Sequence, residues 1–169
     1  MFLLFFFMII TIYNRQRDLA LTTAPLKKAI PLLLKHLSIE TKEVIIHFVS
    51  EKAIRQLHLD FFNDPSSTDC ISFPLDPPTE KQNTHHIIGE IFVCPKTALL
   101  YCQDKQIDPY FETLLYIVHG LLHLIGYDDL SLQDRKIMRH MEKKCLAFLQ
   151  STTFLHLSFL IKKNKKKLS

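Results

Sequence analysis

Residues 119–129 read His-Gly-Leu-Leu-His-Leu-Ile-Gly-Tyr-Asp-Asp and combine two histidines, two glycines and two carboxylates within eleven residues. His119 and His123 are four residues apart, so on a helix both imidazoles leave the same face, one turn from each other. Gly126 allows the backbone to end the helix and reverse, and Asp129 follows three residues later. A helix with two ligands and a turn with a third can build an open zinc site that keeps one position for water. The pattern therefore predicts metal-assisted hydrolysis.

The two histidines also have a simpler interpretation, as packed side chains that are hydrogen-bonded to their neighbours. Buried polar rings without partners cost a few kcal/mol each, and a single metal ion would satisfy both rings. The zinc proteases share the two histidines, the glycine and the third-ligand position in their H-E-x-x-H-x-x-G-x-x-H pattern. Here Gly120 replaces the glutamate that serves those enzymes as general base. The sequence therefore favours a metal site without protease activity.

The histidines lie in a segment that is predicted to be the central helix of the domain. Asp108 followed by Pro109 is typical of a helix start, with an N-cap residue before proline at the first position. The residues that follow are apolar nearly all round, which predicts a helix through the centre of the domain. Ser131 with Asp134 resembles a capping box, and the helix that it opens is expected to run to about residue 150.

Apolar runs, prolines and caps predict the other elements. We expect strands at residues 8–13, 44–50, 70–73 and 87–94, and helices at 25–37, 51–59 (capped by Ser50) and 95–103. Pro31 should either kink the first helix or mark its true start. The order of elements predicts an α+β fold, a small mixed sheet of about four strands covered by helices, with a zincin-like helix carrying the metal ligands.

Length and composition predict one domain of ordinary size. A length of 169 residues with 47% hydrophobic content is enough for a real core, and 22% charged residues argue against wholesale disorder. The formal charge of +4 is mild. The cysteines are scattered without a C-x-x-C pair, which favours reduced thiols in a cytoplasmic protein over a disulfide framework.

Both ends of the chain are unusual in composition. The opening apolar run of about twelve residues is short for a membrane span and lacks the features of a signal peptide. We favour a hydrophobic N-terminal extension at residues 1–7 before the first strand, and we expect no stable membrane insertion. Residues 151–169 form a tail that is apolar and then lysine-rich. Such a tail either contacts phosphate or is simply a solvated end.

Several motifs together resemble one family. Residues 119–129 resemble H-G-x-L-H-L-x-G-Y-D-H, the signature of the YbeY family of bacterial metal-dependent endoribonucleases linked to ribosomal RNA maturation. Residues 68–74, Thr-Asp-Cys-Ile-Ser-Phe-Pro, resemble its T-D-V-L-S-F-P segment, 88–91 resemble its G-D-I strand, and 138–142 resemble its M-x-x-x-E motif. The similarity covers residues 8–150, which we take as a single YbeY-like metallohydrolase domain.

The resemblance implies a site and a role. It implies that His119, His123 and Asp129 hold one Zn²⁺, although nickel, cobalt or manganese could also fill such a site. Asp128 is the competing carboxylate, and we expect it to support the turn or a ligand instead. The resemblance further implies cleavage of single-stranded RNA, not DNA, in the cytoplasm, in maturation of the small-subunit rRNA 3′ end and in ribosome quality control. RNA and the ribosome would then be the partners.

The sequence departs from the family pattern at two positions. The third ligand is usually histidine; Asp129 can replace it as a zinc ligand, but its charge should leave the metal less Lewis-acidic. The family's L-N-x-x-Y-R motif corresponds to residues 57–62, so Phe62 stands where an arginine would bind phosphate. Either another cation replaces this arginine, or activity is weakened, and Phe62 itself could belong to the core. The candidate cations are Arg55, Lys96 and His58.

A non-catalytic RNA- or ribosome-binding module with a structural zinc is the alternative function. The missing arginine motivates it, whereas structural zinc usually has four protein ligands and the sequence shows three. A hydrolase of small molecules or peptides is a third possibility. Glu112, two turns before His119, could support the site, but a solvated or helix-start charge is the favoured interpretation.

Overall fold

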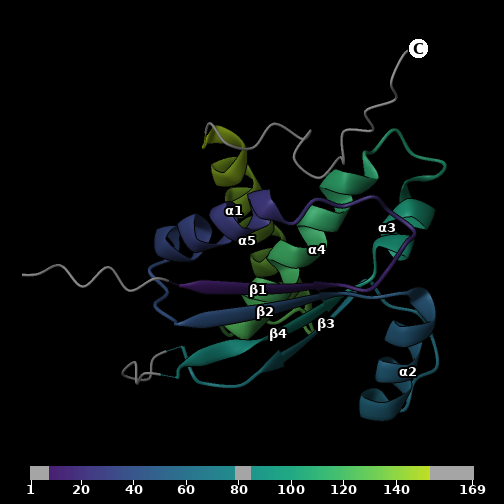
Figure 1. Ribbon diagram of the computed structural model, residues 1–169, viewed down its shortest axis with the longest axis horizontal. Helices are drawn as coiled ribbons and strands as arrows, with labels where there is room; N and C mark the ends of the chain where they lie inside the picture. The colour runs from purple at the N-terminus through teal and green to yellow at the C-terminus, as the bar shows by residue number, and fades with distance from the viewer. Residues whose placement is uncertain (1–7, 79–84, 153–169) are drawn as a thin grey trace, which may run out of the picture.

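The computed structural model describes residues 8–78 and 85–152, and its elements follow the predicted order (Figure 1). The strands are β1 (Ile9–Asn14), β2 (Glu43–Phe48), β3 (Cys70–Pro74) and β4 (Ile87–Val93). The helices are α1 (Ala24–His36), α2 (Glu51–Phe62), α3 (Pro95–Cys102), α4 (Pro109–Leu124) and α5 (Leu132–Ser151). The extension at residues 1–7 and the tail from residue 153 onward lie outside the described residues.

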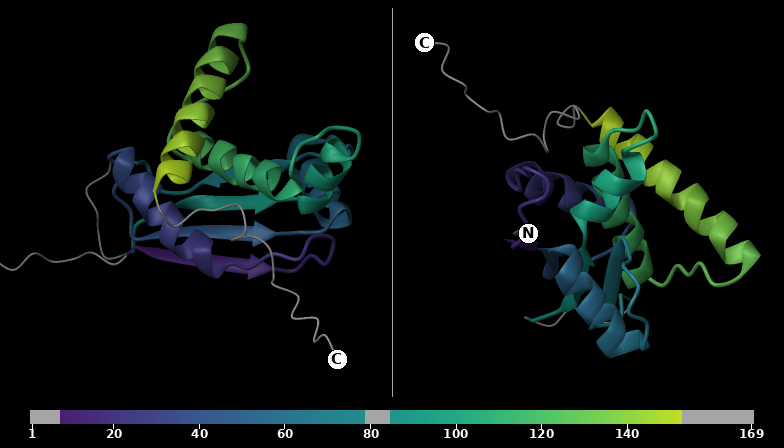
Figure 2. Two further views of the ribbon diagram at one scale, coloured as in Figure 1. Left: turned by 90° about the horizontal axis from the view of Figure 1, so that it is seen from above. Right: turned by 90° about the vertical axis from the view of Figure 1, so that its right-hand side faces the viewer.

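The four strands form one mixed sheet in the order β1-β2-β4-β3. β1, β2 and β4 are parallel neighbours, and β3 pairs antiparallel with β4 at the edge. Helices α1, α4 and α5 gather over one face of the sheet, as Figures 1 and 2 show. α2 instead packs beside β3 through a small cluster that includes Ile54 and Ile71. The predicted α+β fold, a small mixed sheet covered by helices, is confirmed.

Side chains that were predicted to cap helices do so. The Ser50 hydroxyl accepts the Ala53 N–H at 3.3 Å at the start of α2. Asp108 Oδ1 accepts the Tyr110 N–H at 2.8 Å before α4. The Ser131 hydroxyl likewise accepts a backbone N–H, that of Asp134, at 3.0 Å before α5. Each bond satisfies a donor that the first helical turn leaves free, so these helix starts are encoded locally.

Pro31 lies inside α1 and does not mark the start of this helix. Proline removes one backbone hydrogen bond and crowds the preceding turn, so its position requires a compensating interaction. α1 buries apolar residues on both sides of the proline, Leu26 and Ile30 before it and Leu33 and Leu34 after it. Packing of this face against the core therefore holds the helix together, and the expectation of a true start at Pro31 is wrong.

The core lies between one face of the sheet and the helices. Val44, Ile46 and Phe48 alternate along β2 and are fully buried, whereas the residues between them are partly exposed. α4 contributes many of the buried side chains on the helix side and contacts both β3 and β4, as its apolar sequence predicts. Within residues 8–78 and 85–152, neither α4 nor any other helix has the length and apolarity needed to cross a membrane.

Two glycines allow α4 to lie unusually close to the sheet. A Cβ atom placed on Gly120 would lie 2.6 Å from Cγ2 of Ile91 in β4. A Cβ atom on Gly89 would lie 2.5 Å from the Phe73 carbonyl oxygen and 2.6 Å from Cδ2 of Leu124. Gly120 therefore has a packing role: the position that bears glutamate in the zinc proteases here has no room for a side chain.

Candidate metal centre and the adjoining cavities

The turn after α4 brings Asp129 back toward the helix. The Tyr127 N–H donates to the Leu122 carbonyl at 3.0 Å, which is the long bond of a Schellman motif. Gly126 has a φ of +97°, in the region that glycine adopts at least cost. Asp128 Oδ1 then accepts the N–H of Asp129 at 2.7 Å. This bond joins the Asp128 side chain to the backbone of the turn next to Asp129.

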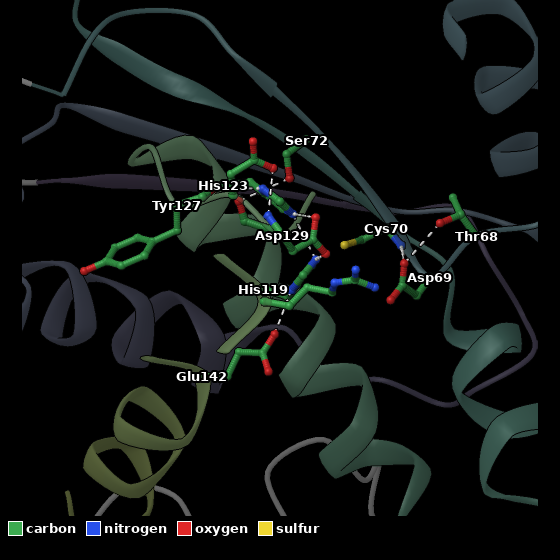
Figure 3. Close-up of polar contacts among 12 residues, drawn as sticks. Thr68, Asp69, Cys70, Ser72, His119, His123, Tyr127, Asp129 and Glu142 are labelled. Atoms are coloured by element: carbon green, nitrogen blue, oxygen red, sulfur yellow. Dashed lines mark hydrogen bonds and ion pairs between the residues drawn. The ribbon is translucent and has the colours of Figure 1, made fainter. Parts of the chain in front are cut away.

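His119, His123 and Asp129 converge, and Figure 3 shows their side chains pointing toward one another. The two Nε2 atoms of the histidines are 3.0 Å apart. The Asp129 carboxylate oxygens lie 3.8 Å from His119 Nε2 and 3.9 Å from His123 Nε2. One ligand atom from each residue lies within 4.8 Å of the others, so these three residues, here called the His-His-Asp group, could hold one metal ion.

Both imidazoles are oriented through their other ring nitrogen. His119 Nδ1 lies 2.7 Å from Oε1 of Glu142, which α5 supplies, and His123 Nδ1 lies 2.9 Å from the Tyr127 carbonyl oxygen (Figure 3). Hydrogen bonds of this kind set the tautomer and the ring orientation of metal-binding histidines. The sequence placed Glu142 in a family-like motif without assigning it a role, so this contact is a finding of the structure.

The hydrogen bonds show why the site fits a cation. The Tyr127 carbonyl and the Glu142 carboxylate can only accept, so each Nδ1 carries the proton when the imidazoles are neutral. His119 and His123 then direct two Nε2 lone pairs at each other across 3.0 Å. Such lone pairs repel unless a proton or a cation lies between them, and Asp129 adds a negative charge beside them. The donor set therefore matches that of a zinc site.

In the metal-free protein, His119 holds a proton more readily than a free histidine does. Burial lowers its pKa, but the hydrogen bond with Glu142 and the charges of Asp69, Glu142 and Asp129 outweigh burial, so the net pKa is raised. A proton on Nε2 would occupy the space between the two imidazoles. Protons and metal ions therefore compete for this position, and acid favours the metal-free form.

Glu142→Gln tests the orienting contact. An amide still accepts from Nδ1 but carries no charge. We therefore expect zinc affinity to fall by about tenfold, the smaller of the losses that follow when the hydrogen-bond partner of a metal-binding histidine is changed. Competition between the protein and a chromophoric chelator measures the affinity. Glu40→Gln removes an exposed carboxylate elsewhere and is the matched control. Equal affinity in the Glu142 variant and the wild type would show that this contact does not support metal binding.

Two cavities adjoin the His-His-Asp group. The larger, of about 510 Å³, is lined by Arg135 and Arg139 of α5 together with Asp69, Glu112 and Glu142, and is called the arginine cavity. The smaller, of about 350 Å³, is lined by His58, Phe62 and Leu130 and is called the phenylalanine cavity. Thr68, His119 and Asp129 line both cavities. The candidate metal centre therefore lies between two open spaces.

The three candidate replacements for the family arginine lie in different cavities. His58 lines the phenylalanine cavity, whereas Arg55 and Lys96 line separate cavities that the His-His-Asp group does not touch. Arg135 and Arg139, which the sequence did not single out, are the arginines beside the group. Their spacing of four residues on a predicted helix was the available signal, but the partner of that helix face was unknown.

The expectation that Phe62 belongs to the core is wrong, and of the two interpretations of Glu112 the helix-start charge holds and the solvated charge does not. Phe62 is 57% exposed and does not belong to the core, because it lies in the last turn of a helix in which Ile54 alone is buried. Glu112 does lie in the first turn of α4, but it is only 8% exposed and not solvated. Burial raises the pKa of Glu112, partly offset by a hydrogen bond with Tyr116.

Comparison with known proteins then identifies the family. A family model described as Endoribonuclease YbeY matches residues 11–150. The chain belongs to the YbeY family. Endoribonuclease YbeY from Protochlamydia amoebophila is 45% identical over 142 residues, which cover 84% of this chain and 93% of that protein. Endoribonuclease YbeY from Chlamydia muridarum is 39% identical over 149 residues, which cover 87% of this chain and 92% of that protein.

A solved structure also resembles this YbeY family member. The solution structure of TM1509 from Thermotoga maritima superimposes with a TM-score of 0.60 at 25% sequence identity. The similarity covers 83% of this chain and 89% of that one. The fold around the candidate metal centre is therefore shared over most of both chains.

Proposed function

We propose that this chain is a metal-dependent endoribonuclease that cleaves single-stranded RNA, with one Zn²⁺ held by His119, His123 and Asp129. The observation that carries the proposal is the 3.0 Å approach of the two Nε2 atoms with a carboxylate beside them. Membership of a family described as endoribonucleases supports the reaction. Residues 8–150 would form the single metallohydrolase domain.

The proposed biological role is maturation of the small-subunit rRNA 3′ end and ribosome quality control in the cytoplasm. The resemblance of the 119–129 and 68–74 motifs to the YbeY signature supports this role, as does the family membership. The partners would be single-stranded RNA and the ribosome, without DNA and without stable membrane insertion.

The side chains around the group would prepare it for hydrolysis. A bound zinc ion would activate water and neutralise charge on the phosphate. Glu142 and the Tyr127 carbonyl hold the two imidazoles in place before any ion binds, so little reorganisation is needed. The Asp129 side chain remains 40% exposed, which leaves the group accessible to solvent and substrate. Asp129 also brings a negative charge, which would moderate the Lewis acidity of the metal.

Metal removal tests the proposal directly. The purified full-length chain is incubated with a single-stranded oligoribonucleotide labelled at either end, as prepared, after treatment with a chelator, and after zinc is added back. We expect internal cleavage, its loss in chelator and its recovery with zinc, because hydrolysis depends on the ion. A DNA strand of the same sequence should remain intact. Equal cleavage with and without chelator would reject the metal mechanism.

The alternative is an RNA- or ribosome-binding module with a structural zinc. Structural sites usually have four protein ligands, and the candidate group found among residues 8–78 and 85–152 has three members. A metal-bound structure of the protein discriminates, because it shows whether the fourth position of the ion is filled by a protein ligand or by water. Four protein ligands, together with no RNA cleavage under any metal condition, would favour the module over the enzyme.

A further inference from the structure

We propose that the RNA strand crosses the His-His-Asp group from one cavity to the other, with backbone phosphate bound by Arg135 and Arg139 and a base stacked on Phe62. This inference rests on the proposed function and specifies how its substrate binds. Thr68, His119 and Asp129 line both cavities, so a ligand that occupies both must pass the group. A position between two cavities suits a strand that continues on either side of the cleaved bond.

The arginine cavity provides the phosphate side. Arg135, Arg139 and Glu142 are spaced four and three residues apart, so they share one face of α5. Glu142 reaches His119 from this face, which shows that the face is turned toward the group.

The charges of the arginine cavity make these arginines necessary for an anionic ligand. Four carboxylates line it, Asp69, Glu112, Asp129 and Glu142, and would repel phosphate. Among the described lining residues, only Arg135 and Arg139 have permanent positive charge. Neither forms an ion pair within the described part of the chain; Arg135 uses only its Nε, in a 3.4 Å bond to the Ser131 carbonyl. Their terminal guanidinium nitrogens are therefore available to bind phosphate oxygens.

The phenylalanine cavity provides the base side. Phe62 is 57% exposed, and its ring is tilted against that of His58 with the centroids 5.4 Å apart. α2 ends at Phe62, because the next residue, Asn63, adopts a left-handed conformation with a φ of 56°. The Phe62 side chain lines the cavity. Exposed aromatic rings bind the bases of single strands by stacking, with little dependence on sequence. The neighbouring Phe61 instead packs its ring against Phe73 and does not line the cavity.

The phosphate side is tested by the salt dependence of RNA binding. Fluorescence anisotropy of a labelled single-stranded oligoribonucleotide is measured with full-length protein in chelator, so that no cleavage occurs. For Arg135→Ala/Arg139→Ala we expect the slope of log K against log salt to become shallower by about 0.7 for each phosphate that the variant no longer binds. Lys136→Ala/Lys143→Ala removes two exposed charges of α5 outside the cavity and is the matched control. An unchanged slope in the arginine variant, or an equal change in the lysine variant, would overturn the assignment.

The base side is tested by pairing protein variants with abasic RNA. Phe62→Ala should weaken binding by about tenfold without changing the salt slope, whereas Phe62→Trp should retain affinity. Phe61→Ala, the neighbouring control, should bind like the wild type. One abasic position in the RNA should weaken wild-type binding and remove the effect of Phe62→Ala. An effect of Phe62→Ala that is the same at every abasic position, or absent, would overturn the stacking role.

These measurements remain informative if the proposed reaction is wrong. Binding in chelator does not require cleavage, so the variants still show whether a strand lies along this path. An active metal-dependent nuclease whose arginine and Phe62 variants bind RNA normally would refute the path alone. Thermal unfolding of each variant shows whether it has folded, and Phe62→Trp keeps the base side testable because it restores a ring.

Discussion

Replacing His119 with alanine is expected to abolish zinc binding and to reduce RNA cleavage by more than about 100-fold. Loss of the hydrogen-bond partner of a ligand already lowers metal affinity or activity by about 10- to 100-fold, and loss of the ligand itself should lower them further. Two donors, His123 and Asp129, would remain, too few to hold zinc in an open site. The fold should persist, since the His119 side chain is partly exposed and its neighbours on α4 supply the core contacts. Metal analysis of the purified variant and the single-strand cleavage assay measure the two effects.

His140→Ala is the matched control for this variant. His140 is an exposed histidine on α5 that belongs to neither cavity, so its replacement should leave metal content and cleavage unchanged. If the His119 variant retained one equivalent of zinc, the proposed ligand set would be wrong. If it lost zinc but cleaved RNA at the wild-type rate, the metal would have no part in the reaction.

Gly89→Ala is expected to destabilise the protein by about 3 kcal/mol, at the upper end of the usual cost of overpacking. The new Cβ would lie 2.5 Å from the Phe73 carbonyl oxygen, which belongs to the paired strand β3 and cannot rotate away. The Leu124 side chain on the other side would also have to move. For a protein of this size such a destabilisation lowers the midpoint of thermal unfolding by roughly 6–12 °C. Differential scanning calorimetry of the metal-free protein measures it.

Gly126→Ala is the control for the glycine prediction. Its Cβ would meet no atom within 4 Å, so the cost is only that of the positive φ, roughly 1–2 kcal/mol. A smaller destabilisation by Gly89→Ala than by Gly126→Ala would show that Leu124 and the strand pair β3–β4 can adjust to a new Cβ at little cost. The packing between Gly89 and its neighbours would then be looser than the distances indicate.

Much of the architecture could be predicted from local patterns. The caps at Ser50, Asp108 and Ser131 are satisfied within a few residues, and the alternation along β2 matches its burial. The i, i+4 spacing of His119 and His123 places both rings on one face of any α-helix, whatever surrounds it. The glycine turn that returns Asp129 is likewise a short-range feature. For these reasons the element order and the three converging side chains follow from the sequence.

The partners of those side chains depend on how distant segments pack. Glu142 lies 23 residues from His119 and reaches it only because α5 packs against α4. The same packing turns Arg135 and Arg139 toward the candidate centre, and the end of α2 leaves Phe62 exposed beside it. Helical periodicity defines which residues share a face, but it carries no information about what that face meets. The sequence alone was thus enough to find the candidate ligands, whereas tertiary packing determined what orients them and which side chains surround them.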